Sequence, residues 1–274
     1  YDIKPYDKTT HQGNIKHVLT KKGYHSEEFM LCFITYQKTI KHIDQIVEIL
    51  VQEFPHIKTI IQNINERHDN VILGDEEKIL YGQGYIYDTL LKNQYKISLK
   101  SFYQINPIQV EVLYQTAIDL AHLNQDSVVL DAYCGIGTIT LSLAKHVKKV
   151  YGVEVIYQAI EDAKNNALLN KIDNVDFVCD DAGKYMVELV KKNTHLDVVF
   201  VDPPRKGCSE EFLEHLLQAS PKEIIYISCD VATQARDAKY LNEHGYTNSV
   251  GKPFTSESIS RILKNEKAKG VIVM

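Results

Sequence analysis

The sequence has few cysteines, and they form no metal-binding pattern. No two of them stand in a Cys-x-x-Cys spacing: they are Cys32, Cys134, Cys179, Cys208 and Cys229. This arrangement excludes a recognisable zinc ribbon or iron–sulfur ligand set, so we expect no metal site. A scattered, odd number of cysteines is typical of a reducing compartment, and we expect a cytoplasmic protein.

Long hydrophobic runs are missing as well. No stretch reaches the roughly 18 apolar residues that a membrane-spanning helix needs, so we expect no membrane partner. The first 17 residues lack the apolar core of a signal peptide. They also lack an initiator methionine, and we therefore expect a fragment or a processed start.

An excess of positive charge is absent too. The net charge is −5, and residues 1–100 hold 13 Lys and Arg against 13 Asp and Glu. This balance argues against a broad electrostatic attraction to nucleic acid, because such binding depends on many phosphate contacts. A local basic patch, or a partner domain that supplies one, stays possible.

The pattern of residues 1–95 predicts a small α+β domain. "FMLCFITY" reads as a strand, and "IKHIDQIVEILVQEF" places Ile43, Ile46, Val47 and Leu50 at helical spacing. Further strand-like segments with glycine turns follow. From residue 96 to residue 274, strands and helices alternate, which predicts an α/β domain with a doubly wound, mostly parallel sheet. Such sheets bind ligands at the carboxyl ends of their strands.

One strand of this second domain ends in a glycine turn. "VVLDAYCGIGTITL" places Asp131 at the strand end, followed by Gly135 and Gly137, which allow the backbone to approach a ligand closely. Glu154 ends the next strand, where an acid can accept hydrogen bonds from both ribose hydroxyls. Leu141 follows instead of the third glycine of the dinucleotide fingerprint. S-adenosylmethionine therefore fits better than NAD.

Acids at two further strand ends are candidate ligand contacts. Asp181 is placed to bind an adenine amino group, although Asp180 competes for this role and a solvent-facing loop acid is an equal alternative. Asp202 begins "DPPR", and the double proline fixes an extended loop. That loop would hold Asp202 and Arg205 at the mouth of the site, unless it is only a rigid surface turn.

Among the cysteines, Cys229 has the most suggestive position. It lies at the end of the strand "EIIYIS" and before the start of a helix, whose N-terminus stabilises a thiolate. We expect Cys32 and Cys179 to be small buried side chains, Cys134 to pack within the glycine turn, and Cys208 to lie on a surface loop. Position alone leaves Cys229 open between packing and catalysis.

Several segments together resemble the RNA 5-methyluridine (uracil-C5) methyltransferases, which modify 23S ribosomal RNA and transfer RNA. The segments are "SFYQINPIQVEVLY", "LDAYCGIGT", "YGVE", "DPPRKG" and "SCDVATQARD", in this order between residues 101 and 237. "QNIN" and "NVILGDEEKILYG" upstream are similar to the ribosomal-RNA branch. The resemblance extends from roughly residue 10 to about residue 250.

The resemblance implies a Rossmann-like, S-adenosylmethionine-dependent methyltransferase domain. Gln104, Tyr133, Glu154 and Asp202 match the cofactor contacts of the family, to which the residue pattern adds Gly135 and Asp181. Cys229 matches the nucleophile that adds to uracil C6, so that C5 can accept a methyl group. The implied activity forms 5-methyluridine, with 23S ribosomal RNA as partner and a monomeric enzyme. The target base must leave its stack.

Three features depart from the family pattern. Asp230 replaces the usual Asn after the nucleophile, and its charge disfavours the thiolate form of Cys229. The C-terminal "Pro-His-Thr-x-His-Val-Glu" segment is altered, which leaves Glu257 as the candidate proton-abstracting base. The N-terminal oligonucleotide-binding barrel and the cysteines of an iron–sulfur cluster are missing. We therefore expect residues 1–95 to be the RNA-contacting central domain and residues 96–274 the catalytic domain.

Two alternative functions stay open. A cytosine-C5 RNA methyltransferase uses the same thiol addition, and analysis of the product base separates it from a uridine enzyme. The altered C-terminal segment also fits a cofactor-binding, RNA-associated protein with impaired catalysis. Cofactor binding without methyl transfer would indicate that protein.

Overall fold

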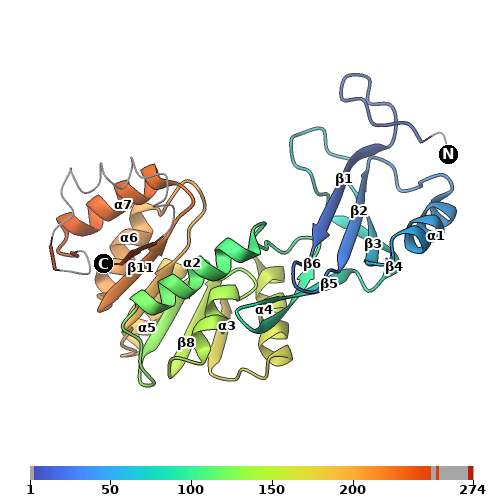
Figure 1. Ribbon diagram of the computed structural model, residues 1–274. Coiled ribbons are helices and arrows are strands. Elements are labelled where there is room, and N and C mark those ends of the chain that lie inside the picture. The colour runs from blue at the N-terminus through green and yellow to red at the C-terminus, as the bar shows by residue number, and fades with distance from the viewer. Residues whose placement is uncertain (1–2, 248–250, 253–270, 274) are drawn as a thin grey trace. The chain divides into compact units, whose positions relative to one another are not determined.

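The computed structural model describes residues 3–247, 251–252 and 271–273 (Figure 1). The chain forms two compact units, Tyr1–Tyr103 and Gln104–Met274. Each unit has its own sheet and its own buried core.

The first unit contains a 4-stranded sheet and a β-hairpin. The sheet has the order β1-β2-β3-β4, in which β2 and β3 are parallel and the outer pairs are antiparallel. Helix α1 makes the crossover between the two parallel strands. The elements are β1 (Ile15–Lys22), β2 (Phe29–Thr35), α1 (Ile43–Glu53), β3 (Ile57–Ile64), β4 (Glu76–Gly82), β5 (Tyr85–Leu90) and β6 (Asn93–Ser98).

The alternation of side chains explains the core of this unit. Along β2, the buried Met30, Cys32 and Ile34 alternate with the half-buried Leu31 and Phe33, as expected when one face of a strand is covered. Helix α1 packs against β3 and β4 through its apolar stripe. The unit is thus the small α+β assembly that the sequence predicts.

The boundary between the units lies later than the sequence indicates. A boundary after residue 95 would cut β6, whose residues through Ser98 pair with β5. Lys21 Nζ also donates to the backbone oxygens of Ser98 (2.9 Å) and Ser101 (2.7 Å). These bonds hold the chain on the first unit as far as Ser101, and the second unit begins at Gln104.

The second unit contains a 6-stranded sheet of order β12-β11-β10-β7-β8-β9. Neighbouring strands are parallel except β12, which runs antiparallel to β11. The prediction of an α/β, Rossmann-like domain is confirmed. The strands are β7 (Val128–Ala132), β8 (Lys149–Glu154), β9 (Val175–Cys179), β10 (Val198–Val201), β11 (Glu223–Ile227) and β12 (Val271–Val273).

Helices cover both faces of this sheet. Apolar side chains of α5, α6 and α7 pack on the face that carries Leu130, Val199 and Tyr226. Asp131 points to the opposite face, where Thr140 of α3 donates to it. The helices are α2 (Pro107–Leu120), α3 (Thr138–Ala144), α4 (Tyr157–Leu169), α5 (Ala182–Lys191), α6 (Glu210–Ala219) and α7 (Val231–Glu243).

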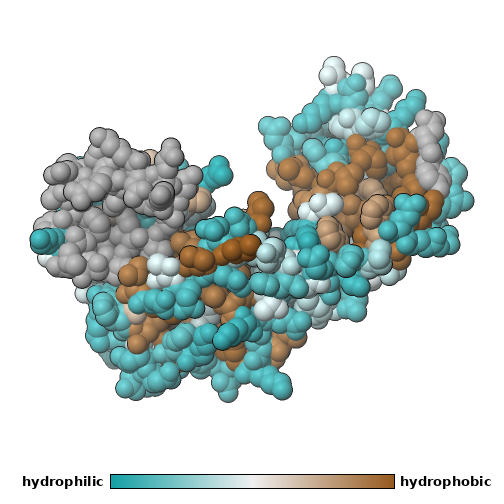
Figure 2. Space-filling model, in the orientation of Figure 1, coloured by the Kyte–Doolittle hydropathy of each residue, from teal (hydrophilic) through white to brown (hydrophobic). Residues whose placement is uncertain are grey.

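Apolar side chains also gather on the outer surface of α2 (Figure 2). The exposed fractions are 48% for Ile108 and 58% for Val112, which lie four residues apart on one side of α2, and 97% for Ile105 just before the helix. Among the helices that the structure describes, none combines the length and hydropathy that a membrane crossing requires.

The sheet topology predicts where a ligand binds. The strand order reverses between β7 and β10, and in open α/β sheets the ligand crevice lies outside the carboxyl ends of the strands at such a switch point. The loops after β7 and β10 flank this point, and the loop after β11 is next to them.

Candidate active site

Strand register brings the predicted site residues to one edge of the second unit. Ala132 pairs with Val201, and Val201 pairs with Tyr226, so the chain leaves β7, β10 and β11 at similar levels. Tyr133 follows β7, Asp202 follows β10 and Cys229 follows β11. Glu154 ends β8 opposite Cys179 of β9, and Asp181 comes two residues later. The structure thus collects at this edge the residues that the sequence had proposed singly.

Asp131 is a buried acid to which the sequence analysis assigned no contact. Its Oδ2 atom accepts a 2.6 Å hydrogen bond from Thr140 Oγ1, whereas Oδ1 is buried and has no hydrogen-bond partner among the described residues. Burial raises the pKa of Asp131 to about 7, against the lowering effect of Thr140, and the nearby charge of Asp202 raises it further. In the sequence, the position of Asp131 just before the glycine turn is the feature that indicates a residue of the site.

Asp202 is the second acid of this region, and burial raises its pKa to about 6. Its charge also acts on Tyr114, a buried residue of α2 whose pKa is raised by burial first and by Asp202 second. Hydrogen bonds with the side chains of Thr138 and Gln104 lower the pKa of Tyr114. Gln104 and Asp202 thus both act on the pKa of Tyr114, a residue that the sequence alone does not single out because it reads as an ordinary helix-core residue.

The glycine turn after β7 is held by the neighbouring strand. The backbone N–H groups of Tyr133 and Cys134 both donate to the Val153 oxygen, at 3.0 and 2.9 Å. Tyr133 adopts a left-handed conformation with φ of 78°, which is costly for a residue with a side chain. Its ring packs on Phe212 of α6 with 5.4 Å between ring centroids. The Tyr133 side chain thus packs against the buried core of the second unit.

Gly135 and Gly137 are needed for different reasons. Gly135 has φ of 54°, yet a Cβ atom there would meet nothing within 4 Å, so the backbone conformation alone favours glycine. Gly137 has φ of 85°, and its Cβ would lie 2.9 Å from Phe177 Cζ. Open space therefore lies over Gly135, at the switch point, while Gly137 permits close packing of α3.

Glu154 and Asp181 both take part in local backbone contacts. Glu154 Oε1 accepts from the Ile156 N–H at 3.0 Å. Asp181 is the N-cap of α5, and its Oδ1 accepts from the Lys184 N–H at 3.0 Å. Asp180, the competing candidate, accepts from the Asp181 N–H at 2.7 Å. The exposed Asp181 thus has a structural role, whether or not it also contacts a ligand.

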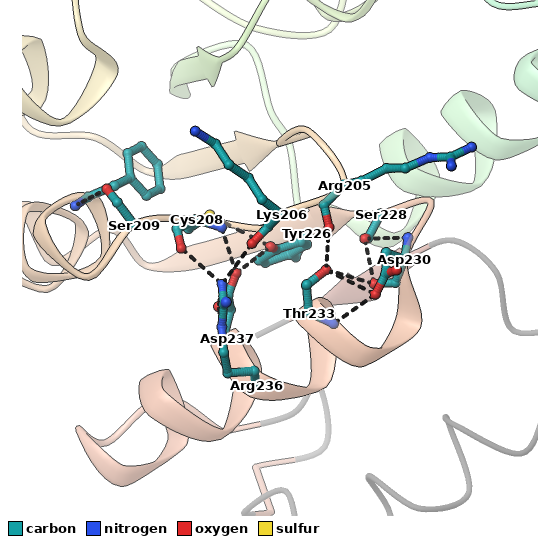
Figure 3. Close-up of polar contacts among 11 residues, drawn as sticks. Arg205, Lys206, Cys208, Ser209, Tyr226, Ser228, Asp230, Thr233, Arg236 and Asp237 are labelled. Carbon is teal, nitrogen blue, oxygen red and sulfur yellow. Dashed lines mark hydrogen bonds and ion pairs between the residues drawn. The ribbon is translucent and has the colours of Figure 1, made fainter.

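Cys229 is exposed and directly precedes α7. Its neighbour Asp230 is the N-cap of this helix: Oδ1 accepts from the Thr233 N–H at 2.9 Å, and this bond lowers the pKa of Asp230. Ser228 Oγ accepts from the Asp230 N–H at 3.0 Å (Figure 3). Asn caps helices as well as Asp does, so the unusual Asp230 preserves this local structure.

Two expectations about the other cysteines were wrong. Cys179 is exposed, because it ends the edge strand β9. Cys208 is buried instead of lying on a surface loop, because its N–H donates to Asp237 at 2.8 Å and its thiol lies 3.6 Å from the Tyr226 hydroxyl. Burial raises the pKa of Cys208 to about 12, which makes it a poor nucleophile. Cys32 and Cys134 are buried as expected.

The candidate base Glu257 lies outside the described residues. The structure therefore places Tyr133, Gly135, Glu154, Asp181, Asp202 and Cys229 at one edge of the sheet. Gln104 precedes α2 and acts on the pKa of Tyr114, and the position of Glu257 stays undescribed.

Comparison with known proteins identifies the family. The model of the tRNA (Uracil-5-)-methyltransferase family matches residues 26–252. The chain belongs to that family. The resemblance seen in the sequence is thereby confirmed, and the Rossmann-like fold agrees with it.

Two curated relatives are similar over most of this chain. A Streptococcus mutans protein named as an uncharacterized RNA methyltransferase is 49% identical over 246 residues, which cover 90% of this chain and 54% of the relative. An Oceanobacillus iheyensis protein of the same description is 43% identical over 92% of this chain and 55% of the relative. The chain thus spans about half the length of the curated relatives it matches.

A solved structure is also similar. The Pyrococcus abyssi tRNA (uracil-54, C5)-methyltransferase, crystallised with S-adenosyl-L-homocysteine, superimposes with a TM-score of 0.73 and 25% identity. The similarity covers 96% of this chain and 60% of the archaeal one.

Proposed function

We propose that this protein transfers a methyl group from S-adenosylmethionine to C5 of a uridine in 23S ribosomal RNA. The observation that carries the proposal is the exposed thiol of Cys229 at the same sheet edge as the buried Asp131 and the half-buried Asp202. A nucleophile for a pyrimidine ring and a binding site for a cationic cofactor thereby share one edge.

The acids support a cationic ligand. A buried carboxylate is unfavourable unless it is paired, and Oδ1 of Asp131 has no hydrogen-bond partner among the described residues. S-adenosylmethionine carries an ammonium and a sulfonium group, either of which would compensate a negative charge here. The free space over Gly135 agrees with close approach of such a ligand to the glycine turn.

We assign the remaining contacts from the family pattern and their positions. Glu154 would bind the ribose hydroxyls, and Asp181 the adenine amino group. Gln104 and Tyr133 would complete the cofactor site.

The chemistry requires a covalent step, because uracil C5 is a weak nucleophile. The Cys229 thiolate adds to C6 and forms a carbon–sulfur bond, and the electron pair of the C5–C6 double bond moves into an enolate with carbanion character at C5. When bound, the cofactor would supply the methyl group that C5 takes, with cleavage of its S–CH3 bond to leave S-adenosylhomocysteine. A base, which we propose to be Glu257, takes the C5 proton, and the C6–S bond breaks to release the thiolate. The uracil must be flipped out of its stack to reach Cys229.

An aromatic and basic patch on the first unit supports RNA as the partner. The rings of His11 and His68 lie 4.2 Å apart, and those of Tyr6 and Tyr36 lie 4.9 Å apart, measured between centroids. Lys16 Nζ lies 5.0 Å from the Tyr6 centroid. Rings and cations in this combination stack with bases and attract phosphates. We propose that the first unit contacts RNA through this patch.

The test is methylation by the full-length protein. 23S ribosomal RNA and transfer RNA would be incubated separately with cofactor carrying a labelled methyl group, followed by nucleoside analysis. We expect labelled 5-methyluridine from 23S ribosomal RNA, loss of the product with Cys229→Ala, and normal product with Cys179→Ala, an exposed thiol at the same edge.

The other outcomes discriminate between functions. Labelled 5-methylcytidine would identify a cytosine enzyme, and product on transfer RNA alone would exclude the ribosomal substrate. Cofactor binding without label in any RNA would indicate a binding protein with impaired catalysis and would overturn the proposal.

A further inference from the structure

The loop that follows Asp202 is tied to α7 by a buried carboxylate. Asp237 of α7 is completely buried, and its Oδ2 accepts from the Cys208 N–H at 2.8 Å and from the Tyr226 hydroxyl at 2.7 Å. Its Oδ1 accepts from Arg236 Nε at 2.7 Å (Figure 3). One side chain thus joins the loop after β10, the strand β11 and the helix α7.

Two further side chains of α7 hold the same loop. Arg236 Nη2 donates to the backbone oxygens of Lys206 (3.1 Å) and Cys208 (3.0 Å). Thr233 Oγ1 lies 3.2 Å from the Arg205 oxygen. The backbone from residue 205 to residue 208 is therefore bonded to three positions on one side of α7.

Gly207 allows the loop to lie this close. A Cβ atom at this position would be 2.6 Å from Arg236 Nη2 and 2.7 Å from Asp237 Oδ2, and the residue has φ of +74°. Both the space and the conformation require glycine. The close contact of loop and helix is thus built into the backbone.

A cavity of about 300 Å³ lies beside these contacts. Its lining is Cys208, Ser209, Glu210, Leu213, Arg236, Asp237 and Tyr240. Arg236 and Asp237 thus border the cavity, while Cys208 is packed in the buried core. The polar contacts and the burial of Cys208 both fix the position of the loop.

The helix is fixed to Cys229 at its N-terminus. Asp230 caps α7 directly after Cys229, and Gln234 Nε2 donates to the Tyr226 oxygen at 3.0 Å. The same helix therefore holds both the thiol and the loop that begins at Asp202.

We infer that Asp237 and Arg236 are positioning residues, which set Asp202 relative to the Cys229 thiol through the contacts of α7 with the 205–208 backbone. The inference rests on the proposed function of Cys229 and Asp202. In reactions between positioned groups, a displacement of about 1 Å costs about a hundredfold in rate. The network would thus be required for the rate and for cofactor affinity, beyond its effect on stability.

The test compares Asp237→Asn with the matched control Asp197→Asn in the full-length protein. Asp197 lies at the opposite edge of the same sheet, where it accepts from the Val128 N–H at 2.8 Å and from Lys222 Nζ at 2.6 Å. Each variant removes the charge of an acid that accepts hydrogen bonds from a backbone N–H group and from a cationic side chain. Only Asp237 contacts the loop that follows Asp202.

Each variant would be measured per folded molecule, at a temperature where thermal unfolding shows both to be native. For Asp237→Asn we expect kcat for RNA methylation to fall about 10- to 100-fold and KM for the cofactor to rise, whereas Asp197→Asn stays within about twofold of the parent protein. Arg236→Lys keeps the charge but loses the forked contacts, and its loss of kcat should be intermediate. This variant replaces Asp237→Asn in the comparison if Asp237→Asn does not fold. Equal kinetics of the Asp237 and Asp197 variants would overturn the inference.

A second readout does not depend on methyl transfer. The cofactor-free protein would be titrated with S-adenosylhomocysteine in a calorimeter. Weaker binding by Asp237→Asn than by Asp197→Asn supports the positioning role even if the parent protein methylates no RNA, an outcome that would count against the proposed function alone. Equal affinities in this arm would contradict the positioning of Asp202.

Discussion

Asp131 pairs in register with Phe200, two residues before Asp202, and the charge of Asp202 raises the pKa of Asp131. Burial is the larger cause and also raises the pKa of Asp202, so the two carboxyls have pKa values of about 7 and about 6. The two acids are neighbours at a topological switch point. One carboxylate oxygen of Asp131 has no partner among the described residues. The site therefore lacks the positive charge that would compensate its acids.

Cofactor affinity should increase with pH through the range of these two groups. A cationic ligand binds the ionised carboxyls, so binding of S-adenosylmethionine should strengthen between about pH 5.5 and about pH 8 and should release protons. Calorimetry in buffers of different ionisation enthalpy measures both effects. Asp131→Asn should reduce the slope and the number of protons released, and an unchanged slope would contradict the assignment.

The stability of the ligand-free protein should change with pH in the opposite direction, because it should decrease as the two acids ionise. The unfolded chain ionises both acids near the ordinary pKa, whereas the folded chain keeps them protonated up to about pH 6 to 7. The contribution of the two acids to the stability of the folded protein therefore becomes less favourable as the pH rises from their ordinary pKa to about 7. The melting temperature of Asp131→Asn relative to the parent protein should increase from about pH 5 to about pH 8; a constant difference would show that Asp131 does not titrate in this range.

Asp230→Asn separates the capping role of this residue from its charge. Asn retains the cap on Thr233, so the free energy of unfolding should change little, whereas Asp230→Ala should lose about 1 kcal/mol. Removal of the negative charge should speed alkylation of Cys229 at neutral pH by about two- to fivefold, the usual size of an exposed charge effect. Slower or unchanged alkylation would show that the charge does not affect the thiolate.

Glu257→Gln tests the proton-abstracting base, for which the resemblance read in the sequence is the sole support. Without a base the methylated, covalently bound uridine cannot eliminate, and turnover should fall by about 10²- to 10⁴-fold. A protein–RNA adduct should then accumulate on natural RNA and remain during denaturing electrophoresis. Turnover at the parental rate would assign the base elsewhere.

Regular periodicity explains why the fold could be predicted. Alternating strands and helices imply a parallel sheet, and a parallel sheet places every strand end that precedes a helix at one edge. Gly135, Glu154, Asp202 and Cys229 could therefore be grouped from their positions at strand ends. The first unit extends beyond residue 95 because β6 pairs with β5, and the polar sequence of β6 gives a weak strand signal.

The contacts between distant segments could not be predicted. Cys208 appeared to lie in a surface loop, yet Asp237 and Tyr226 draw it into the core from other elements. Tyr114 looked like a helix-core residue, and only the folded structure places it near Asp202. Such contacts depend on how loops pack across the sheet, and local sequence patterns do not contain that information.

The central claim is that Cys229 attacks a uracil ring, and trapping the attack tests it most directly. RNA containing 5-fluorouridine would be incubated with the full-length protein and S-adenosylmethionine, and the linked peptide would be identified by mass spectrometry. Since the C5–F bond replaces the proton that the base must remove, the adduct should persist and should map to Cys229. Attachment at another residue, or parental methylation of natural RNA by Cys229→Ala, would contradict the mechanism.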